Sequence, residues 1–447
     1  MNWRKPLIYA LLYLSGSKIP RYLREIVRQQ HNSRQQNDEL TERKLTKLLL
    51  HAYEKVPYYR QILSAHEVVA DGRVRLENFS NLPLLTKDVI REEGGALHAA
   101  DKELRKPYEN TSGGSTGEPV TLLQDRRYNA WNIATTLYFN LALGKEPGES
   151  EIKFWGSDRD ILEGTLTLKD RTLNALYHRK FFNSYRLGEA ELDELIALNN
   201  RFKPQAYWSY MESAFELADY LRRTGRRFHS PRLVISTIGP LTEEVRELIE
   251  SQFGCPVYNQ YGSREVGAIA CQCVRRRGLH TFPWKNYVEI VDDAGRAVEQ
   301  GEGRVVVTTL ENYSMPLIRY EIGDVAVAGG YECPCGGNSF LLDKVVGRTL
   351  GYFKKRDGSK VHSHFIVQAL FFRDWIKRFQ IVQDRLDHVL IRIELRHGTQ
   401  APQAELEDIR AKTKILMGST CVVDYEFADQ IERTASGKYV YTLCQVQ

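Results

Sequence analysis

Apolar residues follow two spacings along this chain, one typical of strands and one typical of helices. From about residue 119 onward, short β-branched or aromatic runs predict strands, and the amphipathic stretches between them predict helices. The predicted strands are Val120–Leu123, Ile152–Trp155, Leu233–Ser236, Val257–Asn259, Val288–Val291 and Val305–Thr309, and the predicted helices are 128–143, 190–201, 212–224 and 242–253. This alternation predicts an α/β fold with a largely parallel sheet.

Local signals mark individual helix starts and turns. Thr242 precedes two glutamates, which is typical of a helix N-cap with acidic residues at the positive end of the helix dipole. The segment Asp292-Asp293-Ala294-Gly295 lies between two predicted strands and indicates a hairpin turn.

The first sixty residues are predicted to be mainly helical. Leucines and Ala52 recur at helical spacing from Leu45 until Val56-Pro57 ends the helix. Residues 7–28 are predicted to form one helix that packs on the domain, with weak contact to a membrane surface as the alternative. Its apolar run is too short to span a bilayer, and no small-residue cleavage site follows it cleanly. No transmembrane segment is predicted elsewhere.

The pattern changes after Gly347-Arg348. Beyond it the sequence predicts a turn at Asp357-Gly358, a strand at Val389–Glu394, a helix at 403–416 and a strand at Val422–Phe427. We therefore predict a large N-terminal α/β domain over residues 1–347 and a small C-terminal α+β domain over residues 348–447.

Composition excludes several classes of protein. Hydrophobic residues make up 42% of the 447 positions and charged residues 27%, which argues against a disordered chain. The net charge of +5 is too small for a dedicated nucleic-acid binder, and Arg275–Arg277 is interpreted as a solvated loop. The seven cysteines are odd in number and include two Cys-x-Cys pairs, so a disulfide framework is not expected. A cytoplasmic protein fits best.

A segment rich in Ser, Thr and Gly precedes the first predicted strand. It reads Thr111-Ser112-Gly113-Gly114-Ser115-Thr116-Gly117-Glu118-Pro119. Its glycines let backbone N–H groups converge, and its hydroxyls add donors, so the segment suits phosphate oxygens. It lacks the Gly-Lys-Ser/Thr ending of a Walker loop. Composition alone also allows a flexible linker.

Further along the chain, three segments carry groups that could serve a nucleotide. In Asn259-Gln260-Tyr261-Gly262-Ser263-Arg264-Glu265, the tyrosine could stack on a purine or line an acyl pocket, the serine could bond a phosphate oxygen, and the glutamate could hold Mg²⁺. Asp324, beside a glycine, could accept both ribose hydroxyls, and Lys438 in Thr434-Ala435-Ser436-Gly437-Lys438 could neutralise a transferring phosphoryl group. The alternative for the first segment is an ordinary strand-to-helix turn, for Asp324 a plain turn, and for Lys438 a surface charge.

Together, these motifs resemble those of the adenylate-forming superfamily in their order and separation. Within it, the chain is most similar to the phenylacetate–CoA ligase branch and its capsular-polysaccharide CapK-type relatives. Leu48-Leu49-Leu50-His51-Ala52-Tyr53-Glu54-Lys55-Val56-Pro57-Tyr58-Tyr59-Arg60 resembles that branch's N-terminal signature. The resemblance covers nearly the whole chain. It implies a large adenylation domain with a mobile C-terminal lid, and activation of a carboxylic acid by ATP to an acyl-AMP with release of pyrophosphate.

The resemblance also implies a role for each matching residue. Catalysis would fall to Lys438, which bridges the substrate carboxylate and α-phosphate, and to Glu265, which holds Mg²⁺. Ser112, Ser115 and Thr116 would bind the β- and γ-phosphates, Ser263 would contact the α-phosphate, and Gly239 would border adenine. Tyr261 would stack near adenine or the acyl group, and Asp324 would bind the ribose hydroxyls, with Arg348 close by. The other nucleotide-binding residues that the resemblance implies are Thr111, Gly113, Gly114, Gly117 and Gly262.

Three positions depart from the family pattern. Val120 stands where many members carry a lysine, and the segment framing adenine reads Ile238-Gly239-Pro240. The usual acidic hinge residue is replaced by Leu350-Gly351, which puts in doubt the domain swing used for a second, thioester-forming step.

A cysteine–histidine set suggests a structural zinc site. Three cysteines and one histidine suit a closed tetrahedral site, and unliganded buried thiols are the alternative. The resemblance of Gly278-Leu279-His280 and the later Cys-x-Cys-Gly to elements of the branch favours Cys273, His280, Cys333 and Cys335 as ligands, with Cys271 as an alternate. Such a metal would pin the loop after Glu265 to the base of the small domain.

The acyl substrate and the acceptor stay open. Tyr207, Trp208 and Tyr210 form either an aromatic pocket wall or ordinary core, and Glu212 either pairs with a substrate amine or starts a helix. The acceptor is an amine, as in polysaccharide or secondary-metabolite biosynthesis, or CoA, as in a phenylacetate-type ligase of aromatic acid metabolism. A non-catalytic, zinc-stabilised scaffold is a third alternative, against which the intact Glu265, Asp324 and Lys438 argue. A monomer or a homodimer is expected.

Overall fold

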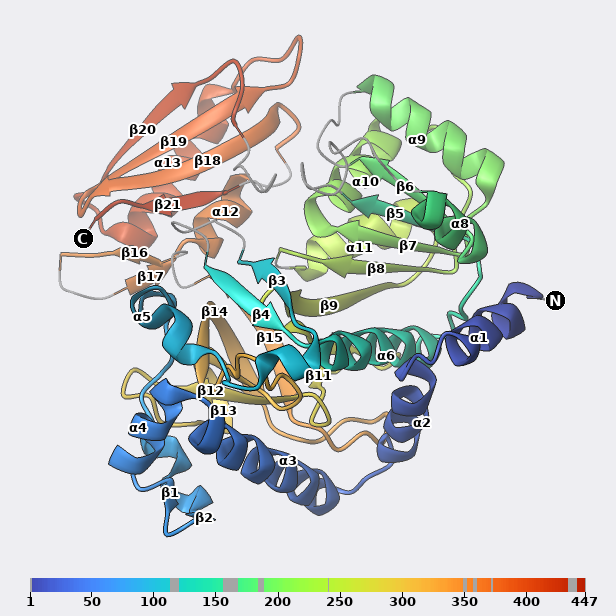
Figure 1. Cartoon of the computed structure of the whole chain (residues 1–447). Helices are drawn as coiled ribbons and strands as arrows, with labels where there is room; N and C mark the ends of the chain where they lie inside the picture. The colour runs from blue at the N-terminus through green and yellow to red at the C-terminus, as the bar shows by residue number, and fades with distance from the viewer. Residues whose placement is uncertain are drawn as a thin grey trace. The chain divides into compact units, whose positions relative to one another are not determined.

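The computed structural model describes residues 2–112, 120–155, 168–183, 189–239, 241–348, 352–356, 360–370, 373–432 and 440–446. These residues form two compact units, with the division between Val345 and Val346. The prediction of an α/β fold is confirmed, and the main sheet has eleven strands among the described residues (Figure 1).

Helices open the larger unit. The stretch predicted as one helix over 7–28 is two helices, α1 Arg4–Leu14 and α2 Ile19–Gln29, so the predicted continuity was wrong. Gly16 has a left-handed φ of 67°, which ends the first helix, and Pro20 lies in the first turn of α2, where its missing N–H is not needed. As predicted, Val56-Pro57 separates the next two helices, α3 Arg34–Lys55 and α4 Pro57–Ala65.

Small elements connect these helices to the main sheet. They are a hairpin of β1 Val69–Ala70 and β2 Arg73–Val74, three short 3₁₀ turns at Leu76–Asn81, Gly94–Leu97 and Lys102–Arg105, helix α5 Lys87–Glu93, and a hairpin of β3 Tyr108–Thr111 and β4 Thr121–Gln124. The last hairpin flanks the Ser/Gly-rich segment, whose residues 113–119 lie outside the described residues.

One half of the eleven-stranded sheet is parallel. Its strands, in spatial order, are β6 Arg179–Asn183, β5 Glu151–Trp155, β7 Ala206–Tyr210, β8 Leu233–Thr237 and β9 Val257–Ser263. The helices of this half are α6 Arg126–Ala142, α8 Leu168–Leu176, α9 Glu189–Phe202, α10 Met211–Thr224 and α11 Glu243–Phe253. The predicted Thr242 N-cap is confirmed, because its hydroxyl accepts from the N–H of Val245.

Helices cover both faces of this half. On β7, Trp208 points to Phe139 of α6, with ring centroids 6.3 Å apart, and Tyr207 points to Phe253 of α11, at 5.7 Å. Neighbouring residues of a strand point to opposite faces of the sheet. Because helices cover both faces, both rings are buried in the core.

The other half of the sheet is antiparallel, so the prediction of a largely parallel sheet was wrong there. It contains β10 Gly267–Gln272, β11 Leu279–Thr281, β12 Asn286–Val291, β13 Gln300–Thr309, β14 Tyr320–Gly329 and β15 Leu341–Arg348. The connections between paired strands that are consecutive in the sequence, such as Arg264–Val266 between β9 and β10, are too short to hold the crossover helix that parallel strands need. The turn predicted at Asp292–Gly295 is confirmed, since Gly295 donates its N–H to the carbonyl of Asp292.

The smaller unit is an α+β arrangement of its own. A four-stranded sheet has the order β20 Val422–Phe427, β19 His388–Leu395, β18 Ile376–Arg385 and β21 Thr442–Cys444. Helices α12 His364–Leu370 and α13 Gln403–Met417 and the hairpin of β16 Tyr352–Lys354 and β17 Lys360–His362 complete it. The strands and helix predicted from 389 to 427 are confirmed.

Candidate functional site

Several predicted nucleotide-site residues of the larger unit gather at the carboxyl ends of its parallel strands. The strands end in register, because Tyr210 of β7 pairs with Thr237 of β8, which pairs with Gln260 of β9. Gly239 lies two residues after the end of β8, and Tyr261 to Ser263 complete β9. In α/β sheets, this edge is where ligands bind.

The turn after β8 is strained. Ile238 has a φ of 57° and Gly239 a φ of 104°, and a Cβ added to Gly239 would lie 3.0 Å from Oε1 of Glu212. A β-branched residue in the left-handed region costs about 1–3 kcal/mol, and such strain clusters at functional sites. The turn therefore brings bare backbone to the strand edge, beside the Glu212 carboxylate at the start of α10.

Tyr261 and Asp324 are joined by a hydrogen bond. The Tyr261 hydroxyl donates to Oδ2 of Asp324 at 2.7 Å, and both side chains are buried at 9% exposure. The ring of Tyr261 packs in the main hydrophobic core, and its hydroxyl contacts the Asp324 carboxylate. The fold thus unites two residues that were predicted separately, one near adenine and one at the ribose.

Glu265 lies in the tight turn between β9 and β10. Its carboxylate is buried, and Oε1 is 3.8 Å from Nζ of Lys87, at the start of α5. A buried carboxylate needs a cation or several donors close by, and Lys87 supplies the cation. This lysine could not be identified from the sequence, because no local pattern around the Thr86 N-cap links it to Glu265.

Side chains from other elements fix the backbone of this turn. The carbonyls of Arg264, Glu265 and Val266 accept hydrogen bonds of 2.7–3.1 Å from Asn110, Gln124, Tyr128 and Lys285. At Gly262 a Cβ would come 2.6 Å from the carbonyl oxygen of Gly267, so the close approach of β9 and β10 requires glycine. Glu265 is therefore held in one position before any ligand binds.

The base of the Ser/Gly-rich segment is closed by a serine. Ser112 is buried, its hydroxyl accepts from the N–H of Val120 at 2.9 Å, and its own N–H donates to the Val120 carbonyl at 2.9 Å. Thr111 pairs with Thr121 across the hairpin. The predicted residues Gly113, Gly114, Ser115, Thr116, Gly117 and Lys438 and the side chain of Arg348 lie outside the described residues.

The predicted metal ligands come together. The ligand atoms of Cys273, His280, Cys333 and Cys335 all lie within 4.8 Å of one another. Sγ of Cys273 is 3.6 Å from Sγ of Cys333, close to the separation of about 3.7 Å that two thiolates have in a tetrahedral zinc site. Nε2 of His280 is 3.4 Å from Sγ of Cys335, and its Nδ1 is 3.2 Å from the Ser339 hydroxyl. Such an outer partner orients a ligating histidine.

The fifth candidate, Cys271, lies outside this group. Its thiol is buried in the core, and burial raises its pKa well above the usual value. Both Cys-x-Cys arms belong to the larger unit, one where β10 ends and one between β14 and β15. The expectation that a metal pins the loop after Glu265 to the small domain was therefore wrong, since the four ligands join two hairpins of one unit.

The aromatic residues proposed for an acyl wall divide between two places. Tyr207 and Trp208 are core residues, whereas the Tyr210 ring lies 4.5 Å from that of Trp155. These last two residues end β7 and β5, so they lie at the same strand edge as Gly239.

Known proteins match this sequence and this fold over most of the chain. Residues 353–444 match the CapK C-terminal domain family. The phenylacetate–coenzyme A ligase of Thermus thermophilus is 26% identical over 80% of this chain and 81% of its own length, and protein CapK of Staphylococcus aureus is 23% identical over 87% and 85%. A crystal structure of 2-hydroxyisobutyryl-CoA ligase in the postadenylation state superposes with a TM-score of 0.70 at 20% identity, over 92% of this chain and 90% of that one, which shows a shared fold. The chain is therefore a relative of phenylacetate–coenzyme A ligase and CapK, has the fold of the adenylate-forming ligases and ends in a CapK-type domain.

Proposed function

We propose that this chain uses ATP to activate a carboxylic acid as an acyl-adenylate. The observation that carries the proposal is the pairing of Tyr261 with Asp324 at the carboxyl edge of the parallel strands, where the fixed turn of Glu265 also lies. These are the residue types that a ribose and a phosphate-bound Mg²⁺ require.

Each group has one task in the proposed reaction. A substrate carboxylate oxygen bonds to the α-phosphorus of ATP while the bond from that phosphorus to the bridging oxygen breaks, and pyrophosphate leaves. Asp324 binds the ribose hydroxyls, oriented by the Tyr261 hydroxyl. When bound, Mg²⁺ neutralises charge that develops on the phosphates, and the Glu265 carboxylate is positioned to hold it.

The remaining roles rest on sequence. Ser115 and Thr116 are proposed to bind the β- and γ-phosphates, Ser263 the α-phosphate, and Lys438 the charge between carboxylate and phosphate. The acceptor of the acyl group is proposed to be CoA or an amine. The 2-hydroxyisobutyryl-CoA ligase fold supports the first, and the replaced hinge at Leu350-Gly351 supports the second.

Pyrophosphate exchange across a library of carboxylic acids tests the first half-reaction. At least one acid should drive exchange of labelled pyrophosphate into ATP, and Asp324→Asn should abolish most of that exchange while the protein still folds. Acid-independent ATP binding with no exchange for any acid would favour the scaffold alternative. Adding CoA or candidate amines to the active mixture then identifies the acceptor from the product.

We also propose that Cys273, His280, Cys333 and Cys335 hold a structural zinc ion. Four protein ligands leave no open position, so the metal would stabilise the two hairpins rather than react. Metal analysis should find close to one zinc ion per chain. The Cys333→Ser variant should lose this zinc, and the matched control Cys444→Ser, which lies outside the cluster, should retain it. A zinc-free wild-type protein would exclude this site.

A further inference from the structure

The first helix presents an apolar stripe to solvent. Trp3, Leu7, Leu11 and Leu14 are spaced three or four residues apart and so share one face of α1. Their exposed fractions are 61%, 41%, 45% and 84%. A continuous apolar face of this kind marks a surface that is covered by something else.

The opposite side of α1 is anchored to the larger unit. Ile8 is buried, Nζ of Lys5 forms an ion pair of 2.6 Å with Glu146, and the Asn2 side chain donates to the Pro147 carbonyl at 2.8 Å. The stripe therefore faces outward from a helix that is held in place.

Positive charge lies next to the stripe. Lys18 is the N-cap of α2, and the helix itself carries Arg21, Arg24 and Arg28. The Arg24 guanidinium is 5.9 Å from the ring centroid of Tyr13, near the end of α1. Within the described part of the chain, no carboxylate forms an ion pair with any of these four cations. The apolar and basic surfaces are therefore contiguous.

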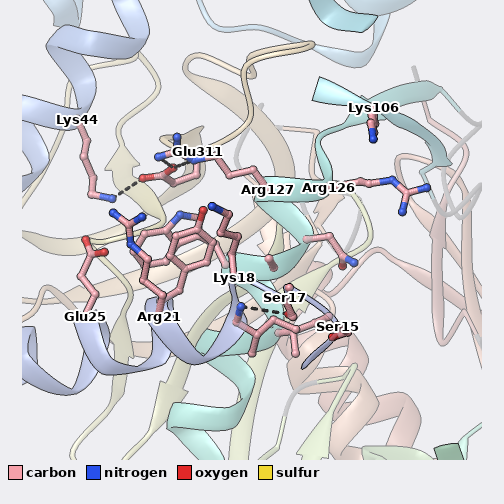
Figure 2. Close-up of a pocket in the computed structure, with 17 residues that line it drawn as sticks. Ser15, Ser17, Lys18, Arg21, Glu25, Lys44, Lys106, Arg126, Arg127 and Glu311 are labelled. Atoms are coloured by element: carbon pink, nitrogen blue, oxygen red, sulfur yellow. Dashed lines mark hydrogen bonds and ion pairs between the residues drawn. The ribbon is translucent and has the colours of Figure 1, made fainter. Parts of the chain in front are cut away.

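A basic cavity opens beside the same helices. It has a volume of about 1100 Å³ and is lined by the loop Ser15–Lys18, by α2 and by the start of α6 (Figure 2). Six basic and two acidic residues line it, namely Lys18, Arg21, Lys44, Lys106, Arg126 and Arg127 against Glu25 and Glu311. Figure 2 shows that Lys44 and Arg127 both pair with Glu311, so the other cations give the cavity an excess of positive charge.

We propose that α1 and α2 dock this chain on the surface of an anionic membrane. The apolar stripe enters the interface between headgroups and acyl chains, and the cations of α2 and of the cavity bind headgroup phosphates. Trp3 and Tyr13 are the residue types that prefer this interface.

The dimensions and the charge favour a membrane surface over other occupants. The 11 residues of α1 span about 16 Å, roughly half of a bilayer core, and no helix among the described residues is long and apolar enough to cross one. A second copy bound through a two-fold contact would bring two basic α2 helices together, and their like charges would repel.

Flotation of the full chain with lipid vesicles tests this proposal. The chain should bind vesicles of phosphatidylcholine that contain phosphatidylglycerol, bind phosphatidylcholine alone far more weakly, and dissociate as salt is added. Leu14→Gln should weaken binding about tenfold, since several CH₂ groups leave the interface. The double change Arg21→Glu with Arg24→Glu should weaken it by at least about twentyfold, at roughly fivefold for each cation.

Matched measurements separate docking from misfolding and from self-association. Ile415→Gln removes a comparably exposed residue, at 81%, from α13 of the smaller unit and should leave vesicle binding unchanged. Brominated acyl chains should quench tryptophan fluorescence in the wild type but not in Trp3→Phe. Three results would each overturn the proposal. The first is vesicle binding that does not depend on phosphatidylglycerol, and the second is quenching that is unchanged in Trp3→Phe. The third is a dimer that Leu14→Gln converts to a monomer when the wild type binds no vesicles.

Discussion

Removal of the Tyr261 hydroxyl isolates one contact of the proposed nucleotide site. Tyr261→Phe keeps the ring in the core and deletes only the donor to Asp324, which lies 2.7 Å away and is nearly buried. A hydrogen bond to a charged group contributes about 1.5–3 kcal/mol. We expect the free energy of unfolding to fall by about that amount.

Nucleotide binding should weaken as well, because the Asp324 carboxylate loses one of the contacts that orient it. If half or more of the hydrogen-bond energy is expressed in binding, the Kd for ATP with Mg²⁺ rises about three- to tenfold or more. Titration calorimetry measures this Kd without knowledge of the acid substrate.

A second buried tyrosine provides the control. Tyr59 donates to the Pro316 carbonyl at 2.9 Å and accepts from the N–H of Ile318 at 3.1 Å, within the same core. Tyr59→Phe should lower the free energy of unfolding by about 1–2 kcal/mol and leave the Kd for ATP unchanged. Equal changes in Kd for the two variants, or a Tyr261→Phe variant that binds ATP normally, would refute the role given to the Tyr261–Asp324 pair.

Three further changes test other parts of the molecule. Lys438→Ala should slow acid-dependent pyrophosphate exchange by about 10²–10³-fold with no loss of folding, and an unchanged rate would show that another residue supplies this charge. Lys87→Met should lower the free energy of unfolding by about 2 kcal/mol in urea denaturation without ligand, and Mg²⁺ with ATP should restore most of the loss; failure to restore it would contradict Mg²⁺ at Glu265. Burial alone would raise the pKa of Glu151, but Lys145, at 2.6 Å, and a neighbouring arginine outweigh it and hold the pKa at about 2. Because this pKa lies below that of the unfolded chain, the stabilisation is complete above about pH 5 and is lost as the pH falls toward 2. The unfolding free energies of wild type and Glu151→Gln should therefore differ by about 3–5 kcal/mol near pH 7, and this difference should shrink as the pH falls from about 5 to about 2. A difference that stays constant with pH would contradict the role given to this ion pair.

The sequence alone determined the local elements and most candidate groups. Strand β8, helix α11 with its Thr242 cap and the turn at Asp292–Gly295 follow from apolar spacing, capping and turn chemistry, which act over a few residues. The four residues proposed as zinc ligands could be named because their spacing and their resemblance to a known family pointed to one site.

Only the tertiary structure decided which distant groups meet. The hydrogen bond from Tyr261 to Asp324 joins β9 to β14, although three other strands separate them in the sheet order. The ion pair of Lys87 with Glu265 depends on where α5 packs. The antiparallel half of the sheet and the placement of Cys271 in the core likewise follow from strand order. Strand order and packing are set by the burial of apolar surface between segments far apart in the chain. The periodicity of one segment shows which of its faces is buried, but it does not show which other segment packs against that face.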